Sequence, residues 1–180
     1  FALRAYRLDF QSFWSDEGLS LQRAALGLPA MLDAMPVEHL PGYFILLHFW
    51  LPATGGYDFA LRFLSLWPSV LSVALLYRLG VDLGYRPAGL AAALLLATNG
   101  FQIWYAQEAR MYSWLLAASL LSAIALGRLL ALDGRRRDRA RWGWGITYAL
   151  ATAATVYLHL FGALTPLAQT IFMAGWLAVR

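Results

Sequence analysis

Long apolar runs separated by short polar stretches dominate the pattern of this chain. An α-helix needs about 20 apolar residues to cross a hydrocarbon core of about 30 Å. Three charged residues, Arg62, Arg78 and Arg128, fall inside the apolar runs of this chain. Each lies near the end of its run, where a long side chain can extend to the membrane interface. We predict five membrane-spanning helices, at residues 60–80, 87–106, 111–132, 143–160 and 163–179.

Two earlier segments also have helical patterns, and we expect them to lie at the membrane interface. The apolar stretch 41–51 is closed by Pro52 and two following glycines, which leaves it too short to span a bilayer. Residues 19–35 alternate apolar and polar positions at helical spacing, with a bend expected at Pro29. The apolar side of this second segment is predicted to comprise Leu21, Ala25, Leu28 and Leu32.

The composition agrees with a membrane protein, because 61% of the 180 residues are hydrophobic and only 13% are charged. Soluble domains are about 45 to 50% apolar. The absence of cysteine excludes a disulfide scaffold.

With no repeat and no linker, we predict one partial all-α domain, in which residues 1–57 form an extracytoplasmic loop with interfacial helices and residues 58–180 form the transmembrane bundle. The apolar ends of the chain suggest a fragment of a longer protein.

The positive charge comes from 14 arginines and no lysine, and five of the arginines fall within residues 135–141. Such a local cluster orients a protein in a membrane and does not form a basic surface for nucleic acid. Because short arginine-rich loops stay in the cytoplasm, counting spans from this loop places Arg78 and Arg86 on the same side. Residues 1–57 and 107–110 then lie on the outer side, where we expect the chemistry.

Asp16 and Glu17 precede the amphipathic stretch on that outer side. Two neighbouring carboxylates near a bilayer have a raised proton affinity, and one of them could act as a general base. The alternative is structural, because Ser15 is a good helix N-cap residue and acidic residues in a first turn favour the positive end of the helix dipole. Spacing alone leaves both interpretations open.

Residues 107–112 join two predicted spans almost without a loop, so their charges lie at the membrane boundary and need partners. In a helical conformation Glu108 and Tyr112 share a face, whereas Arg110 lies with Gln107 on the other side. Arg110 is predicted either to bind an anionic phosphate through paired hydrogen bonds or to extend to lipid headgroups.

Three histidines need an interpretation as well. Glu38 beside His39 suggests either a pair of metal ligands or a substrate contact, which leaves a divalent metal ion open as a cofactor. His159 lies at a predicted helix end and is a candidate contact, whereas His48 is expected to be buried or interfacial. The chain has no HExxH, GxxxxGK[ST] or GxSxG motif, which excludes most soluble-enzyme mechanisms.

Five segments of the chain form a recognisable pattern: FQSFWSDEGLSL, VEHLPGYFILLHFWL, FALRFLSLWPSVLSVALLYRLG, QIWYAQEARMYSWLL and VYLHLFGALTPLAQ. Together they resemble the family 39 type of C-fold glycosyltransferases. These are integral membrane enzymes related to protein O-mannosyltransferases and to the lipid A aminoarabinose transferase. The similarity runs along essentially the whole chain and covers only the amino-terminal part of such enzymes.

The resemblance implies transfer of a sugar, with inversion, from a polyprenyl-phosphate donor to an unknown acceptor. It places the reaction at the outer face of a bacterial cytoplasmic membrane, with membrane lipids as further partners and no nucleic acid. The donor phosphate would need a cation and its tail an apolar groove, which suits Arg110 and the runs around it.

By the same resemblance, Asp16 is the general base of the family's Asp-Glu motif, and Glu17 orients it or contacts the acceptor. Glu38 and His39 occupy a position near the donor phosphate or a bound metal, although here Leu40 breaks the family's proline pair.

The second outer loop supplies further substrate-binding candidates, Glu108, Arg110 and Tyr112, and His159 in the later outer turn is another. Many relatives carry an aspartate near the position of Tyr112, whereas this chain has Glu108 one turn earlier.

Two other function classes stay open from the sequence. A transporter or channel is suggested by the prolines within predicted spans, Pro68 and Pro166, and it would need polar residues in the middle of helices. A non-catalytic assembly subunit would use the acidic residues only as helix caps.

Overall fold

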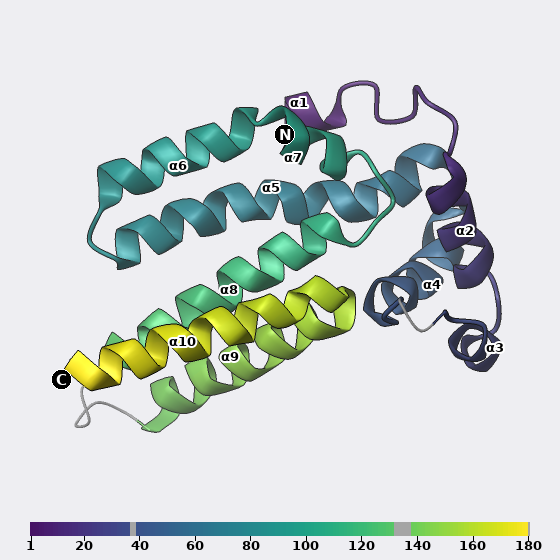
Figure 1. The fold of residues 1–180 in the computed structure, drawn as a ribbon. Coiled ribbons are helices and arrows are strands. Elements are labelled where there is room, and N and C mark those ends of the chain that lie inside the picture. The colour runs from purple at the N-terminus through teal and green to yellow at the C-terminus, as the bar shows by residue number, and fades with distance from the viewer. Residues whose placement is uncertain (37–38, 132–137, 180) are drawn as a thin grey trace.

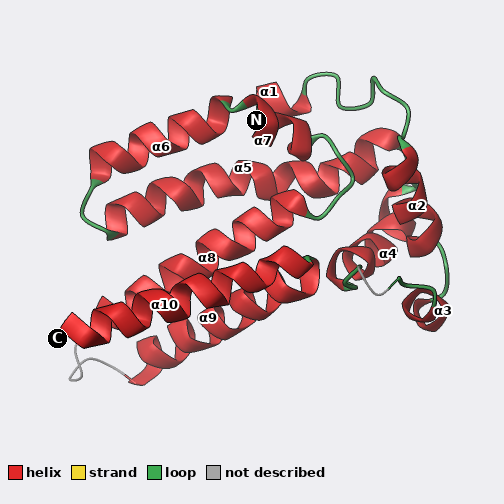
Figure 2. Cartoon of the chain, in the orientation of Figure 1, coloured by secondary structure: helices red, strands yellow, loops and turns green. Residues whose placement is uncertain are grey.

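The computed structural model describes residues 1–36, 39–131 and 138–179, and every regular element in these ranges is a helix (Figures 1 and 2). The helices are α1 (Ala2–Ala5), α2 (Ser15–Ala24), α3 (Leu28–Asp33), α4 (Gly42–Thr54), α5 (Asp58–Asp82), α6 (Arg86–Thr98), α7 (Gly100–Ala106), α8 (Tyr112–Ala131), α9 (Asp138–Leu158), the short 3₁₀ helix η1 (Leu160–Ala163) and α10 (Leu164–Val179).

Three helical stretches in the described part are long and apolar enough to cross a membrane: Asp58–Asp82, Tyr112–Ala131 and Leu160–Val179. They correspond to three of the five predicted spans. A fourth, 143–160, lies mostly in α9, whose 21 residues begin at Asp138 and end at Leu158, before the extended residue His159. The fold is therefore helical and compatible with a membrane protein.

The prediction of a single helix over residues 87–106 is wrong. The helix stops at Thr98, and Asn99 begins α7 as its N-cap, with the side-chain oxygen accepting a hydrogen bond from the Gln102 amide at 2.9 Å. Arg4 of α1 donates to the carbonyls of Leu96 and Ala97, both at 2.9 Å, which satisfies acceptors freed by the break. With 13 residues, α6 is shorter than the length that we expected for a span.

The predicted interfacial helix over residues 19–35 is also two helices. α2 ends at Ala24, and Pro29 lies in the first turn of α3, where its missing N–H costs nothing. The predicted apolar side matches the packed side only in part, since Leu21 packs against buried apolar residues. Ala25 and Leu32 are exposed, whereas the buried residues of α2 are Glu17, Ser20 and Ala24.

The stretch after Pro41 forms α4, a helix of 13 residues that is too short to span, as expected. It continues through Pro52 and ends only at Gly55, which adopts a left-handed φ of 76°.

α5, α6, α8, α9 and α10 run back and forth as a bundle (Figure 1). We call the end where α5, α8 and α10 begin the polar end, and α1 to α4 gather there. At the other end α5 turns into α6 by a close approach of two glycines, since a Cβ on Gly80 would lie 2.3 Å from the Gly89 Cα. Arg78 and Arg128, near that end, both contact Asp82, at 3.0 and 2.6 Å.

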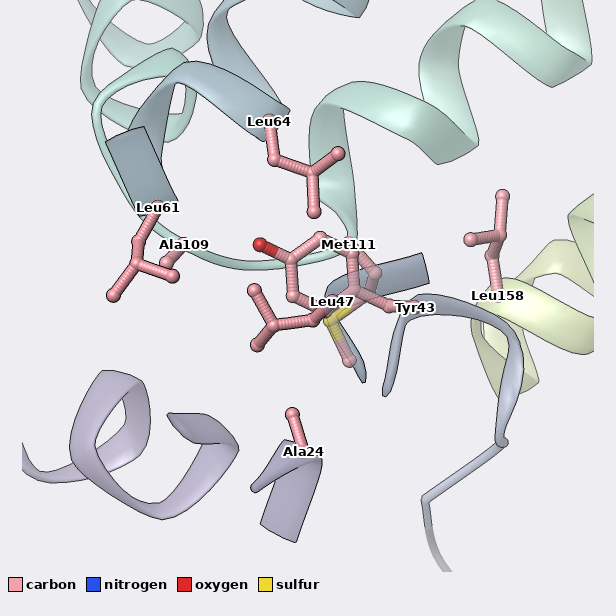
Figure 3. Close-up of a cluster of buried hydrophobic side chains, with 8 residues drawn as sticks. All are labelled: Ala24, Tyr43, Leu47, Leu61, Leu64, Ala109, Met111 and Leu158. Carbon is pink, nitrogen blue, oxygen red and sulfur yellow. The ribbon is translucent and has the colours of Figure 1, made fainter. Parts of the chain in front are cut away.

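A buried apolar cluster lies under the polar end (Figure 3). It joins α2, α4, α5 and α9 to the segment between α7 and α8, and its members are Ala24, Tyr43, Leu47, Leu61, Leu64, Ala109, Met111 and Leu158. Because Ala109 and Met111 point into this cluster, the backbone of residues 107–111 is fixed from within the protein.

Candidate functional site

Glu17 and Arg62 form a buried ion pair at the polar end, which we call the anchor pair. The Arg62 Nε lies 3.0 Å from Glu17 Oε1 and its Nη2 lies 2.8 Å from Oε2, a two-point contact. The Arg62 side chain is 5% exposed and the Glu17 side chain is 1% exposed. Glu17 Oε1 also accepts a hydrogen bond from the backbone N–H of Ala109 at 2.8 Å, so α2 holds the 107–111 segment directly.

Arg62 does more than neutralise Glu17. Its Nη1 donates to the carbonyls of Leu8 at 2.9 Å and Gln11 at 2.8 Å, which fixes the chain that leads into α2. The prediction that Arg62 extends to the membrane interface is wrong, because the interior of the polar end supplies enough acceptors to hold its guanidinium.

Asp16 and Arg110 form the second pair, and it is loose. Arg110 Nη2 lies 3.6 Å from Asp16 Oδ2, and Nη1 lies 3.4 Å from the Ser20 hydroxyl. Direct hydrogen bonds between such charges are about 2.7 to 2.9 Å long. The Arg110 side chain is 7% exposed and that of Asp16 is 41% exposed, so one partner faces the interior and the other faces the surface.

The segment 107–111 is not helical, which corrects the predicted placement of its side chains. The Arg110 amide donates to the Glu108 carbonyl at 2.8 Å, and the Arg110 carbonyl accepts from the Ser65 hydroxyl at 2.9 Å. Arg110 therefore lies against α2 through contacts between distant parts of the sequence, which helical spacing cannot predict.

Glu108 is buried beside Trp104 of α7. The indole Nε1 donates to Glu108 Oε1 at 2.6 Å, while Oε2 has no hydrogen-bond partner. Burial is the largest effect on the Glu108 carboxyl and raises its pKa, and the nearby charge of Glu17 acts in the same direction. The hydrogen bond from Trp104 opposes this shift.

Within the described ranges, the buried side-chain polar atoms without a partner are Glu108 Oε2 and Arg110 Nε. Buried polar atoms are nearly always hydrogen-bonded in proteins, and exceptions occur where a ligand or a reaction needs them. Both exceptions here belong to one five-residue segment.

His159 and Tyr112 lie next to this segment. Their rings are 5.9 Å apart, and the His159 Nδ1 accepts from the Phe161 amide at 3.1 Å, so His159 caps η1. Burial, followed by the charges of Arg110 and His39, lowers the pKa of the His159 imidazole. His39 is 3.3 Å from an Nη of Arg23.

Glu38 lies outside the described residues. Within those residues, no three His, Asp or Glu side chains are grouped so that they could hold a metal ion.

The N-cap interpretation of Ser15 is wrong. Trp14 is the N-cap residue of α2 and makes no side-chain capping bond, so Ser15 is already the first helical residue. Asp16 and Glu17 do lie in the first turn, where the helix dipole favours their charge. Their arginine partners show that this turn has a tertiary role in addition to the favourable dipole.

A cleft of about 830 Å³ opens beside the Glu108 side of the segment, between α1, residues 6–14 and α7. Glu108, Tyr112 and the anchor pair contribute to its walls. Of the predicted site residues, the structure therefore brings Asp16, Glu17, Glu108, Arg110 and Tyr112 together, with His159 next to them.

Sequence reasoning did not select Arg62, Trp104 or Ser20 as site residues. A charged residue inside an apolar run, such as Arg62, is a signal that a buried partner exists. Trp104 carries no such signal, because nothing in its spacing points to donation to Glu108. No family model, curated protein or solved structure matches the chain.

Proposed function

We propose that the polar end is part of the active site of a membrane glycosyltransferase with a C-type fold. The enzyme would transfer a sugar from a polyprenyl-phosphate donor to an acceptor at the outer membrane face. The observation that supports this most is the loose Asp16–Arg110 pair beside Glu108. An exposed carboxylate and an incompletely bonded guanidinium lie together at the polar end of a helical bundle.

Arg110 is the group best suited to the donor phosphate. Its Nε has no partner, and its contacts to Asp16 and Ser20 are longer than strong charged hydrogen bonds. A phosphate oxygen would complete this incomplete set of hydrogen bonds, and the positive charge would stabilise the leaving group as charge develops on it.

Asp16 is the proposed general base. It would take the proton of an acceptor hydroxyl while that oxygen attacks the anomeric carbon of the donor. The bond between this carbon and the phosphate oxygen breaks, and its electron pair leaves on polyprenyl phosphate. A positioned carboxylate contributes about 100- to 10,000-fold in rate.

A transporter gains little support from the helix interiors. Ser122, Thr152 and Gln169 lie in the middle of α8, α9 and α10, but they are uncharged and bond one another at 2.7 to 3.2 Å. Such bonds hold membrane helices together. Pro68 also has a structural explanation, because it lacks an N–H for the Leu64 carbonyl, which accepts from Trp114 Nε1 at 2.9 Å.

The decisive experiment replaces Asp16 in the full-length protein, in membranes supplied with a polyprenyl-phosphate sugar. Asp16→Asn should lower sugar transfer by about 100-fold or more, with expression and thermal midpoint unchanged. The matched control is Asp33→Asn, an exposed aspartate at the end of α3, which should retain full transfer. Transfer by Asp16→Asn at the rate of the control would exclude Asp16 as the base.

A further inference from the structure

The cleft beside Glu108 has strongly aromatic walls. Two of its aromatic side chains, Trp14 and Trp104, are 47% and 59% exposed, so both leave surface for contact with a ligand. Aromatic rings pack well against the C–H faces of other rings and leave polar groups free at their edges. The aromatic lining residues are Tyr6, Phe10, Trp14, Trp104, Tyr105 and Tyr112.

The formal charges on the walls cancel. Arg62 and Glu17 neutralise each other in the anchor pair, and the remaining charged lining residues are Arg7 and Glu108. The Arg7 guanidinium stacks on the Phe10 ring, 3.5 Å from its centroid. The Arg7 backbone has a φ of 56°, a left-handed conformation. Arg110, the group suited to phosphate, does not line the cleft. These walls favour a neutral ligand over an anion or a cation.

Hydrogen-bonding groups complete the lining, from Gln11, Ser12, Gln107 and Glu108. Glu108 is 9% exposed and its Oε2 has no partner, which is the strongest sign that the wall is completed by a ligand. A pocket that combines apolar faces with a few convergent polar groups is typical of small-molecule sites.

From this combination we propose that the cleft binds a neutral saccharide, with a sugar ring against Trp104 and hydroxyl groups on Glu108 and its polar neighbours. This inference rests on the proposed function, in which it identifies the acceptor as a carbohydrate. The donor phosphate belongs with Arg110, which does not line the cleft, whereas Glu17, the neighbour of Asp16, does.

The test measures binding without any donor, by ligand-observed saturation-transfer NMR on the full-length protein in non-glycosidic detergent. Methyl α-D-mannopyranoside is the neutral probe and glucose 1-phosphate the anionic one. Trp104→Leu should weaken binding of the neutral probe by about 3- to 10-fold. The matched control is Trp142→Leu, another exposed tryptophan, at the opposite end of the bundle, which should leave it unchanged.

Glu108 is tested by two variants in the same assay. Glu108→Leu removes the polar groups and should weaken binding by about 10-fold, whereas Glu108→Gln keeps hydrogen-bonding atoms in place and should stay within about 3-fold of the original. Circular dichroism melts of all variants verify that the fold is retained, and Trp104→Phe replaces Trp104→Leu if the latter does not fold.

Three results would overturn the saccharide assignment. One is binding of cyclohexanol as tight as that of the glycoside, which would indicate a lipid groove. Another is tighter binding of glucose 1-phosphate than of the neutral probe. The third is the absence of saccharide binding, or binding that Trp104→Leu and Trp142→Leu affect equally. Sugar transfer to a peptide without saccharide binding would leave the proposed function intact, whereas binding without transfer would count only against the proposed function.

Discussion

Two carboxylates that are neighbours in sequence have different surroundings in the structure. Glu17 is almost inaccessible and its two oxygens accept from Arg62 and the Ala109 amide at 2.8 to 3.0 Å. Asp16 is 41% exposed and meets its arginine only at 3.6 Å. Successive residues of an α-helix point about 100° apart, so one faces the protein interior and the other its surface.

The comparison separates a structural pair from a candidate chemical pair. A buried pair with all its hydrogen bonds made has nothing left for a substrate, whereas an incomplete pair at a surface can exchange one partner for a ligand. The acidic motif therefore combines two tasks, since Glu17 fixes the backbone beside Arg110 and Asp16 remains accessible.

The largest effect on stability is expected from breaking the anchor pair. Arg62→Met leaves Glu17 buried without its cation and should destabilise the protein by about 3 to 5 kcal/mol, measured as a lower thermal midpoint in detergent. The double variant Arg62→Met with Glu17→Leu removes both charges and should recover part of this loss. A single variant that melts like the original protein would show that the pair is not a structural anchor.

A smaller and more selective effect is expected at the loose pair. Arg110→Ala should weaken use of the polyprenyl-phosphate donor by about 10- to 100-fold, because charged hydrogen bonds to phosphate are lost, with little change in the acceptor titration. The control is Arg86→Ala, an exposed arginine at the other end. An unchanged donor titration would indicate that Arg110 interacts with lipid headgroups instead.

The pH dependence of stability tests the environment of Glu108. Burial raises its pKa above the ordinary value of 4.5, so the folded protein keeps a proton that the unfolded chain releases. This contribution is fully present below pH 4.5 and is lost as the pH rises through the higher folded pKa. Thermal midpoints of the original protein should therefore fall with rising pH relative to Glu108→Gln. Parallel profiles would contradict the raised pKa.

The smallest effect is expected at the opposite end of the bundle. Arg78 is 54% exposed and contacts Asp82 four residues later, which is worth about 0.3 to 0.5 kcal/mol. Arg78→Ala should shift the thermal midpoint only slightly, since Arg128 still contacts Asp82. A loss as large as that of Arg62→Met would show that exposure does not distinguish these pairs.

The sequence was sufficient for the helical class and for most helix positions, because apolar run length reports directly on helices of this kind. It was insufficient at residue 99. The dipeptide Asn99-Gly100 is a turn signal, but it lies inside an apolar run that is long enough to predict one continuous helix. At the candidate site, spacing identified Asp16, Glu17, Glu108 and Arg110 as residues to explain. It could not assign partners, because Arg62 lies 45 residues from Glu17 and Ala109 lies 92 residues away.

The break between α6 and α7 at Asn99 also determines the position of the Trp104 indole. Had α6 continued straight, Trp104 would lie about 9 Å farther along its axis than Thr98, at about 1.5 Å per residue. Instead α7 turns off the line of α6 (Figure 1) and delivers the Trp104 N–H to the buried acid. The break leaves α6 with only 13 residues, but it places one hydrogen-bond donor, the Trp104 N–H, beside Glu108. A substitution that fused the two helices would therefore be expected to separate Trp104 from Glu108 without touching either residue.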